Sequence, residues 1–148
     1  MNLRNAWIDL LMRSMSRAHH AVLTLSRGRV GWSVGSLAAV ELHTIGRSTG
    51  KRRSTMLTSP VHDNKRYVLI ASKGGDDRNP QWYQNLVAHP DVELTIRGRT
   101  VPMRARTASA EEKARLWPEI IAAYRGYEQY QRKTRRDIPV VICEPKQE

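Results

Sequence analysis

The chain has 148 residues, most simply one domain with a hydrophobic core of its own. Its formal net charge of +11 predicts an anionic partner and leaves nucleic acid, an anionic lipid surface and an anionic cofactor open. Cys143 is the single cysteine of the sequence, which excludes an internal disulfide and fits a reducing compartment, and the apolar run over residues 138–143 favours a buried strand position for it over a role as nucleophile.

No segment of the sequence approaches the roughly 18 consecutive apolar residues that a transmembrane helix needs. A signal peptide is not expected at the N-terminus, because Arg4, Asp9 and Arg13 interrupt any apolar core there. We therefore expect a cytoplasmic protein that is at most peripheral on the inner face of the plasma membrane.

Residues 1–24 are predicted to form an amphipathic N-terminal helix. Its apolar residues recur at helical spacing and are Ile8, Leu11, Met15, Ala18 and Val22. Arginines lie off this stripe, and Trp7 lies beside it. Packing of the helix on its own domain or on a subunit partner is the favoured interpretation, and contact with a membrane surface is the alternative.

Six short segments after this helix have the composition of β-strands and are separated by turn residues. They are residues 40–47, 53–62, 66–72, 93–97, 101–107 and 138–143. Their hairpin spacing predicts a small antiparallel barrel, and no linker or internal repeat divides the chain. The expected fold class is therefore α+β and mainly β, as a single domain over residues 1–148.

Helices are expected at residues 80–88 and from Ser109 onward, where Ser109 is a candidate N-cap followed by acidic residues. Pro118 would remove a hydrogen bond in the middle of the second helix, so a kink or a restart is expected there. Residues 127–130 predict a further short helical turn.

Two glycine turns at the ends of strand segments are the main candidates for a ligand site. The first covers residues 46–53 and contains the four cations Arg47, Lys51, Arg52 and Arg53. The second covers residues 71–75 and ends in Lys73, Gly74 and Gly75. Glycines allow backbone N–H groups to turn toward an anion, and guanidinium groups bind phosphate or carboxylate oxygens in pairs. The turns predict a cradle for an anionic ligand with a flat ring, and a solvated hairpin tip is the alternative for the first turn.

Common catalytic signatures are missing from the sequence. The five histidines form neither a His-Glu-x-x-His pair nor a cluster with cysteine, so no metal site is predicted. A nucleophile elbow, a P-loop and a dinucleotide-binding glycine motif are missing as well. Hydrolase and nucleoside-triphosphatase functions are therefore disfavoured.

Tyr124, Tyr127 and Tyr130 are spaced by three residues, which on a helix presents their phenols to a common region. A phenol with a pKa of about 10 stays protonated at neutral pH and can donate a hydrogen bond or a proton to a developing oxyanion. The alternative for each tyrosine is that it seals the edge of the core.

Six blocks of this sequence occur in an order and spacing that match a known family. They are residues 44–50 (TIGRSTG), 71–75 (ASKGG), 79–86 (NPQWYQNL), 117–118 (WP), 124–130 (YRGYEQY) and 137–145 (DIPVVICEP). Together they resemble the deazaflavin-dependent nitroreductase family of actinobacteria, over residues 40–145.

The resemblance implies a split β-barrel of about six strands, similar to flavin reductases and pyridoxamine-phosphate oxidases, with flanking helices. It also implies that the cofactor is coenzyme F420, an 8-hydroxy-5-deazaflavin, rather than FMN. Members use the reduced deazaflavin to reduce quinones, enones or nitroaromatic compounds, and some associate with the membrane. The expected function is therefore hydride transfer from reduced F420 to an electron-poor acceptor.

The resemblance further implies roles for individual residues. The family's contacts with the cofactor, its phosphate and its oligoglutamate tail correspond to Arg47, Arg53, Ser72, Lys73, Gly74, Trp82 and Asn85. The other residues of the two turns that are expected to bind the cofactor are Ser48, Lys51, Arg52 and Gly75. Those expected to face the substrate are Tyr124, Tyr127 and Tyr130, of which Tyr127 is preferred as proton donor because it follows Gly126. Ser72 is the other candidate donor.

Two parts of the sequence depart from the family's usual pattern. Ser48 stands where relatives often have a lysine, and Lys51 and Arg52 are expected to replace that charge. Met56 and Thr58 stand where relatives often have a proline and an aromatic residue. The second departure affects the expected shape of the substrate site rather than cofactor binding.

Two other functions remain open. A basic barrel that binds an anionic ligand or a lipid surface without catalysis explains the charge equally well, although Tyr67 is the one aromatic residue in the expected strands on which a nucleic-acid base could stack. An FMN- or haem-using protein of the same fold is the nearer alternative. We expect a small-molecule electron acceptor rather than nucleic acid as partner, and a monomer or weak dimer.

Overall fold

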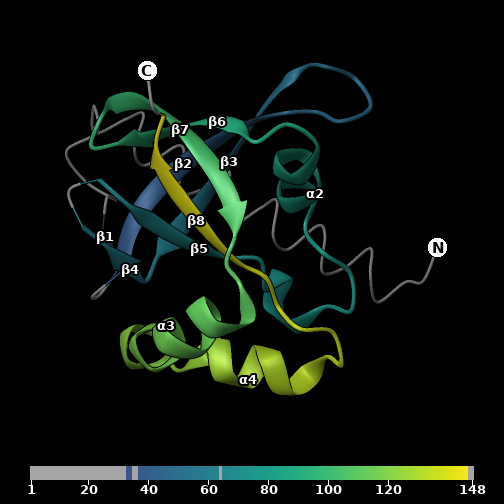
Figure 1. Ribbon diagram of the computed structural model, residues 1–148, viewed down its shortest axis with the longest axis vertical. Helices are drawn as coiled ribbons and strands as arrows, with labels where there is room; N and C mark the ends of the chain where they lie inside the picture. Colours follow the sequence, from purple (N-terminus) through teal and green to yellow (C-terminus); the bar gives the residue numbers. More distant parts are fainter. Residues whose placement is uncertain (1–32, 35–36, 64, 147–148) are drawn as a thin grey trace.

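The computed structural model describes residues 33–34, 37–63 and 65–146, so the helix expected over residues 1–24 lies outside the described residues. It contains the helices α2 (Gln81–Ala88), α3 (Ala110–Ala123) and α4 (Gly126–Lys133) and one 3₁₀ turn, η1 (Lys73–Gly75). Figure 1 shows a curled sheet with α2 at one side and with α3 and α4 together below it. None of the helices in these residues is long and apolar enough to cross a membrane.

The sheet has eight antiparallel strands. They are β1 (Ser33–Val34), β2 (Leu37–Ile45), β3 (Arg52–Ser59), β4 (Val61–His62), β5 (Tyr67–Ile70), β6 (Asp91–Ile96), β7 (Arg99–Thr107) and β8 (Val140–Pro145). Their order is β1-β2-β6-β7-β8-β5-β4, and β3 pairs with β2. The expected mainly-β fold is confirmed, with all six predicted segments present. The segment predicted over residues 53–62 is divided into β3 and β4 at Pro60, which has no N–H for the ladder.

The sheet curls far enough for its two ends to approach each other. β3 extends from one side of β2, and its last residue, Ser59, is fully buried. The Ser59 hydroxyl lies 2.9 Å from the carbonyl oxygen of Val61 and donates to that of Val68 at 2.8 Å, so it ties the end of β3 to β5. The result is a half-barrel whose interior is lined by one face of each long strand.

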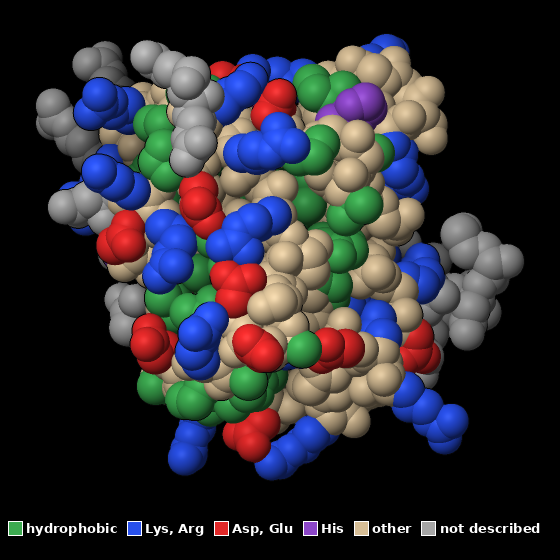
Figure 2. All heavy atoms as spheres, viewed as in Figure 1, with side chains coloured by type: hydrophobic (Ala, Val, Ile, Leu, Met, Phe, Trp, Pro, Cys, Tyr) green, Lys and Arg blue, Asp and Glu red, His purple; other side chains and the backbone are tan. Residues whose placement is uncertain are grey.

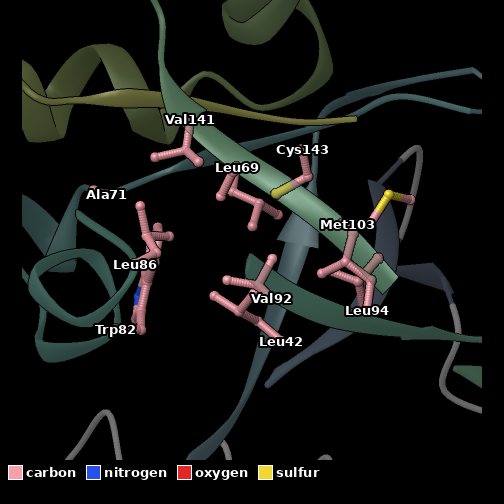
Figure 3. Packing of buried hydrophobic residues seen from close by; sticks show 12 residues of the cluster. Leu42, Leu69, Ala71, Trp82, Leu86, Val92, Leu94, Met103, Val141 and Cys143 are labelled. Atoms are coloured by element: carbon pink, nitrogen blue, oxygen red, sulfur yellow. The ribbon is translucent and has the colours of Figure 1, made fainter. Parts of the chain in front are cut away.

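Apolar side chains of the half-barrel's interior pack against α2 (Figure 3). Leu42 on β2, Leu69 on β5 and Leu94 on β6 are fully buried there. Trp82 and Leu86 of α2 close this core from the side. The alternation of buried and more exposed residues along β6 and β7 follows from the period of two in a strand that has one face on the core.

The strand β8 is apolar on both faces because a second core covers its other side. Val141 and Cys143 face the first core, whereas Val140 and Ile142 pack with Ile120 of α3. A strand covered on both faces is expected to be a continuous apolar run. The predicted burial of Cys143 is confirmed, and that burial raises the pKa of its thiol to about 12.

The helix α3 begins with the expected cap and continues through its proline. The Ser109 hydroxyl accepts from the backbone N–H of Glu112, and the Glu112 carboxylate accepts from the backbone N–H of Ser109. Of the kink or restart expected at Pro118, the restart does not occur, since α3 continues to Ala123. Packing of Leu116 and Ile120 against the second core stabilises the helix on both sides of the missing hydrogen bond.

Candidate cofactor and substrate site

The basic turn, residues 46–53, connects β2 to β3 and is closed by its own backbone. The Gly46 N–H donates to the Lys51 carbonyl at 2.8 Å, and the Gly50 N–H donates to the Gly46 carbonyl at 2.8 Å. Gly50 has a φ of +69°, a conformation that favours glycine. A Cβ on Gly46 would lie 2.6 Å from the Thr49 hydroxyl oxygen, so this turn requires glycine at both positions.

Helix α2 is attached to the basic turn through Asn85. The backbone N–H and a guanidinium N–H of Arg47 donate to the Asn85 side-chain oxygen, at 3.2 and 2.9 Å. The Asn85 amide donates in turn to the Thr44 hydroxyl at 3.4 Å. Asn85 is buried, whereas Arg47 is exposed and has further N–H donors. Asn85 therefore orients Arg47, which the sequence pattern alone did not predict.

Most cations of the sheet are paired with acids, whereas three of the four cations of the basic turn have no ion pair among the described residues. Arg106 pairs with Glu112 and Glu144, and Arg52 of the turn pairs with Glu93. Figure 2 shows acidic side chains among the basic ones on the face toward the viewer. Within the residues that the structure describes, no ion pair involves Lys51 or Arg53 of the turn. The positive charge that remains for an anionic ligand therefore includes this turn.

The second turn, residues 71–75, has the backbone of an anion-binding nest. Ser72 is in the right-handed helical region, with φ −77° and ψ −37°, and Lys73 follows in the left-handed region with φ +46°. A right-handed residue followed by a left-handed one turns successive N–H groups toward one concave side. Gly74 and Gly75 continue with φ of +64° and +86°. Ser72 and Lys73 thus form the nest together with the Gly74 N–H, whereas the Gly75 N–H donates to the Ser72 carbonyl at 2.9 Å. The segment over residues 72–75 is here named the serine nest.

Arg136 binds carbonyl oxygens of the segment that contains the serine nest, and the sequence did not predict this role. Its guanidinium donates to the carbonyl oxygens of Ala71 at 3.1 Å, Ser72 at 2.9 Å and Asp76 at 2.8 Å, and to the Asn79 side-chain oxygen at 3.0 Å. These partners lie 57 to 65 residues away in the chain. Nothing in the local sequence distinguishes Arg136 from its neighbour Arg135. The sequence alone therefore does not predict which of the two arginines makes these long-range contacts.

The serine nest lies against the helix that carries two of the tyrosines. A Cβ on Gly75 would be 2.9 Å from the carbonyl oxygen of Tyr130 and 3.0 Å from the Cβ of Lys133. Both residues belong to α4. Glycine at this position therefore permits the close approach that brings the expected cofactor turn beside the expected substrate residues.

The three tyrosines form one cluster, in which each ring meets the others edge to face. The ring centroids of Tyr124 and Tyr127 are 5.2 Å apart, and each of them lies 6.2 Å from that of Tyr130. The hydroxyls of Tyr124 and Tyr130 are 3.3 Å apart. Tyr124 follows α3 and Tyr127 and Tyr130 lie on α4, so the cluster spans the junction of the two helices.

Exposure differs strongly within the cluster. Tyr127, preferred from the sequence, is 6% exposed and packs in the second core, whereas Tyr124 is 42% exposed. The Tyr127 hydroxyl lies 3.1 Å from that of Thr58 on β3. Gly126 does not free Tyr127 to move; instead it leaves space for the Tyr124 ring, which would lie 2.3 Å from a Cβ there.

The pKa values of Tyr127 and Tyr130 are both raised by their surroundings. The neighbouring Tyr124 hydroxyl, together with burial, raises the pKa of Tyr130 to about 12. Burial also raises the pKa of Tyr127, against a smaller opposite effect of its hydrogen bond to Thr58. Near neutral pH, Tyr127 and Tyr130 are therefore hydroxyl groups rather than phenolates.

Trp82 does not offer a face to a ligand in this structure. It was expected to line the side of the cofactor, but it is 8% exposed and packs in the first core with Leu86 (Figure 3). Its ring meets Tyr83 edge to face at 6.4 Å. Trp82 therefore fixes α2 on the half-barrel, and through Asn85 on the same helix it contributes to the position of Arg47.

Two cavities formed by the described residues lie away from the tyrosine cluster and the serine nest. One cavity, of about 180 Å³, is lined by residues that include His43, Arg52 and Glu93. The other, of about 280 Å³, lies between Leu86 and Thr107. Neither contains Ser72 or any of the three tyrosines.

Known proteins similar to this chain share both sequence and fold. A curated F420H(2)-dependent quinone reductase of Mycobacterium tuberculosis is 38% identical over 131 residues, which cover 85% of this chain and 87% of the relative. The solved structure of an F420-H2 dependent reductase, FDR-A, is 39% identical with a TM-score of 0.65 and matches 72% of this chain and 93% of that one. A domain-swapped dimer that is 36% identical has a TM-score of 0.68 and matches 86% of this chain and 96% of that one.

More distant structures share the fold alone. A protein of the pyridoxinephosphate oxidase family from Clostridium acetobutylicum is 12% identical, with a TM-score of 0.50, and matches 83% of this chain and 82% of its own. The expected similarity to this class of fold is confirmed. The model of the family described as F420H(2)-dependent quinone reductase matches residues 15–145. This chain belongs to the F420H(2)-dependent quinone reductase family.

Proposed function

We propose that this protein is a reductase that uses reduced coenzyme F420 to reduce a quinone-type acceptor. The observation that carries the proposal is the contact of the serine nest with α4 at Gly75. It joins an anion-binding turn directly to the helix of Tyr127 and Tyr130. A reductase of this family needs such an arrangement, in which one side holds the cofactor and the other holds the acceptor.

The residues present fit a cofactor with a long anionic tail. Arg47 and Arg53 are exposed on the basic turn, and Lys51 adds a third charge with no ion pair among the residues described. Guanidinium groups bind carboxylate and phosphate oxygens through pairs of N–H donors. We propose that the basic turn binds the tail and that the N–H groups of the serine nest bind oxygen atoms nearer the ring.

The tyrosine cluster is proposed to bind and orient the acceptor. F420 in its reduced form supplies a hydride when it is bound. A carbonyl oxygen that gains negative charge is stabilised by a donor already in place. Tyr124 and Tyr130 present two such hydroxyls 3.3 Å apart, and Tyr124 is the more exposed of the two. Ser72, which is buried beside α4, remains the second candidate donor.

The proposal is tested by mixing the purified protein with reduced F420 and a soluble quinone and following formation of the oxidised deazaflavin by absorbance. We expect protein-dependent, saturable oxidation, and none when reduced FMN replaces the deazaflavin. Enones and nitroaromatic compounds, which related proteins are expected to accept, belong in the same assay as further acceptors. Protein that gives no oxidation above the uncatalysed rate with any of these acceptors would contradict the proposal.

Replacing Gly126 by alanine should lower turnover of the acceptor without lowering cofactor affinity. The new Cβ would overlap the outer end of the Tyr124 ring, which has to move. Since that end is exposed, we expect less than about 1 kcal/mol of lost stability but roughly a tenfold lower kcat/KM. In a Tyr124→Ala background the same substitution should have no further effect, and an equal loss in both backgrounds would show that Gly126 acts on something else.

A peripheral membrane contact through residues 1–24 is part of the proposal. The support is the amphipathic pattern of that segment in a chain with a net charge of +11. We expect that deletion of residues 1–24 reduces sedimentation with vesicles that contain anionic lipid and leaves F420 affinity unchanged, because all proposed cofactor residues follow residue 40. Vesicle binding that is undiminished by the deletion would place the contact on another part of the chain.

A further inference from the structure

The guanidinium of Arg136 binds the rear of the serine nest at several points. Two of its hydrogen bonds reach consecutive carbonyl oxygens, those of Ala71 and Ser72, at 3.1 and 2.9 Å. The other two reach the Asp76 carbonyl and the Asn79 side chain at the far end of the turn. One side chain therefore spans the whole segment from the end of β5 to the start of α2.

The two consecutive carbonyl contacts determine where the neighbouring N–H groups point. In a planar trans peptide the C=O of one residue and the N–H of the next point in opposite directions. Fixing the carbonyl of Ala71 toward Arg136 therefore turns the Ser72 N–H away from it. Fixing the carbonyl of Ser72 does the same for the N–H of Lys73. These are two donors of the concave side of the nest.

The conformation that Arg136 supports is one that the chain would otherwise avoid. Lys73 is a non-glycine residue with φ +46°, a region that residues with a side chain rarely adopt. Arg136 is itself fixed, because its N–H donates to the Thr134 hydroxyl at 3.3 Å and its carbonyl accepts from Gln131 at 2.8 Å. The guanidinium can thus stabilise the strained turn from a fixed position in the segment that follows α4 in the chain.

We infer that Arg136 is a positioning residue, which aims the Ser72 and Lys73 N–H groups at an anionic oxygen of the bound cofactor. The inference rests on the proposed function, which places F420 on the concave side of the nest. Arg136 lies on the opposite side of the peptide planes, so it acts through the backbone and has no contact of its own with the ligand.

The test compares three variants of the full chain with the unmodified protein. Arg136→Gln removes the charge and most of the hydrogen bonds. Arg136→Lys keeps the charge, but a single ammonium has three donors and cannot reach four separated acceptors. Arg135→Gln is the matched control, because it removes an exposed charge at the adjacent position. Binding of oxidised F420 is measured by fluorescence titration and binding of inorganic phosphate by amide chemical shifts of residues 72–74.

We expect Arg136→Gln to raise the Kd for F420 about tenfold to a hundredfold, Arg136→Lys to raise it at least about threefold, and Arg135→Gln to change it less than about twofold. Phosphate should shift the amides of Ser72 and Lys73 in the unmodified protein and shift them less in both Arg136 variants. Equal effects of Arg135→Gln and Arg136→Gln would overturn the inference, since only net charge would then matter.

The same measurements also test the inference if the Arg136→Gln variant does not fold or if the unmodified protein does not bind F420. If the Arg136→Gln variant does not fold, the Arg136→Lys variant provides the test. An F420 affinity of the Arg136→Lys variant equal to that of the unmodified protein would overturn the inference. If the unmodified protein does not bind F420, the proposed function fails, whereas the phosphate shifts still report whether Arg136 orients the nest. A nest that gives identical phosphate shifts with and without Arg136 contradicts the inference in that case too.

Discussion

Replacing both Arg47 and Arg53 by alanine should weaken the binding of reduced F420 by several kcal/mol, at roughly 1.5–3 kcal/mol for each charge-assisted contact that is lost. Arg47 is already oriented by Asn85, so little side-chain freedom remains to be lost when it binds an anion. Arg53 has no ion pair among the residues that the structure describes. The measurement is a titration of each variant with the deazaflavin, monitored by its fluorescence.

The chain offers a matched control for this double substitution. Arg97 and Arg99 flank Gly98 at the tip of the β6–β7 hairpin and are exposed, so replacing both removes the same charge from another hairpin. We expect that control to change F420 affinity by less than about threefold. If the two double variants lose the same affinity, the basic turn is not the tail-binding site and general electrostatic attraction explains the binding.

Removing the Tyr124 hydroxyl should lower kcat/KM for a quinone by about tenfold to a thousandfold and leave F420 affinity nearly unchanged. Tyr124→Phe keeps the ring over Gly126 and removes only the donor, whose partner is the hydroxyl of Tyr130. Tyr130→Phe should have a smaller effect of the same kind. The measurement is steady-state turnover at several concentrations of the acceptor.

Tyr127→Phe serves as the control within the cluster. Its hydroxyl contacts Thr58 in a nearly fully buried position, so we expect about 1 kcal/mol of lost stability and less than about a threefold change in kcat/KM. On the ground of its exposure we propose Tyr124, rather than Tyr127, as the preferred donor. If all three Phe variants keep full turnover, the tyrosine rings only line the acceptor site, and the proton comes from Ser72 or from water.

The strands were predictable because each long strand has a simple burial pattern. The interior faces alternate with more exposed ones along β6 and β7, and β8 is a continuous apolar run because helices cover its second face. Pro60 divides a predicted strand into two. This division was predictable, because proline has no N–H to donate to a neighbouring strand. At Pro118, by contrast, the helix continues, because packing of α3 against the second core outweighs the loss of one backbone hydrogen bond.

The site was predictable as a set of segments but not as a set of contacts. Glycines and cations identified both turns, and the spacing of the tyrosines identified a cluster. Burial could not be predicted, and it places Trp82 and Tyr127 in the two cores, while their expected roles beside the cofactor and the substrate stay predictions. Arg136 could not be found, since its partners are carbonyl oxygens that any residue carries.

The most direct test of the proposed function is a pair of titrations of the unmodified protein, one with F420 and one with FMN. A single phosphate uses few of the cations on the basic turn, whereas a polyanionic tail can engage Arg47, Lys51 and Arg53 together. We therefore predict that F420 binds at least about tenfold more tightly than FMN and that this preference decreases as salt is added. Equal affinity for the two cofactors, or tighter binding of FMN, would contradict the assignment of this site to the deazaflavin.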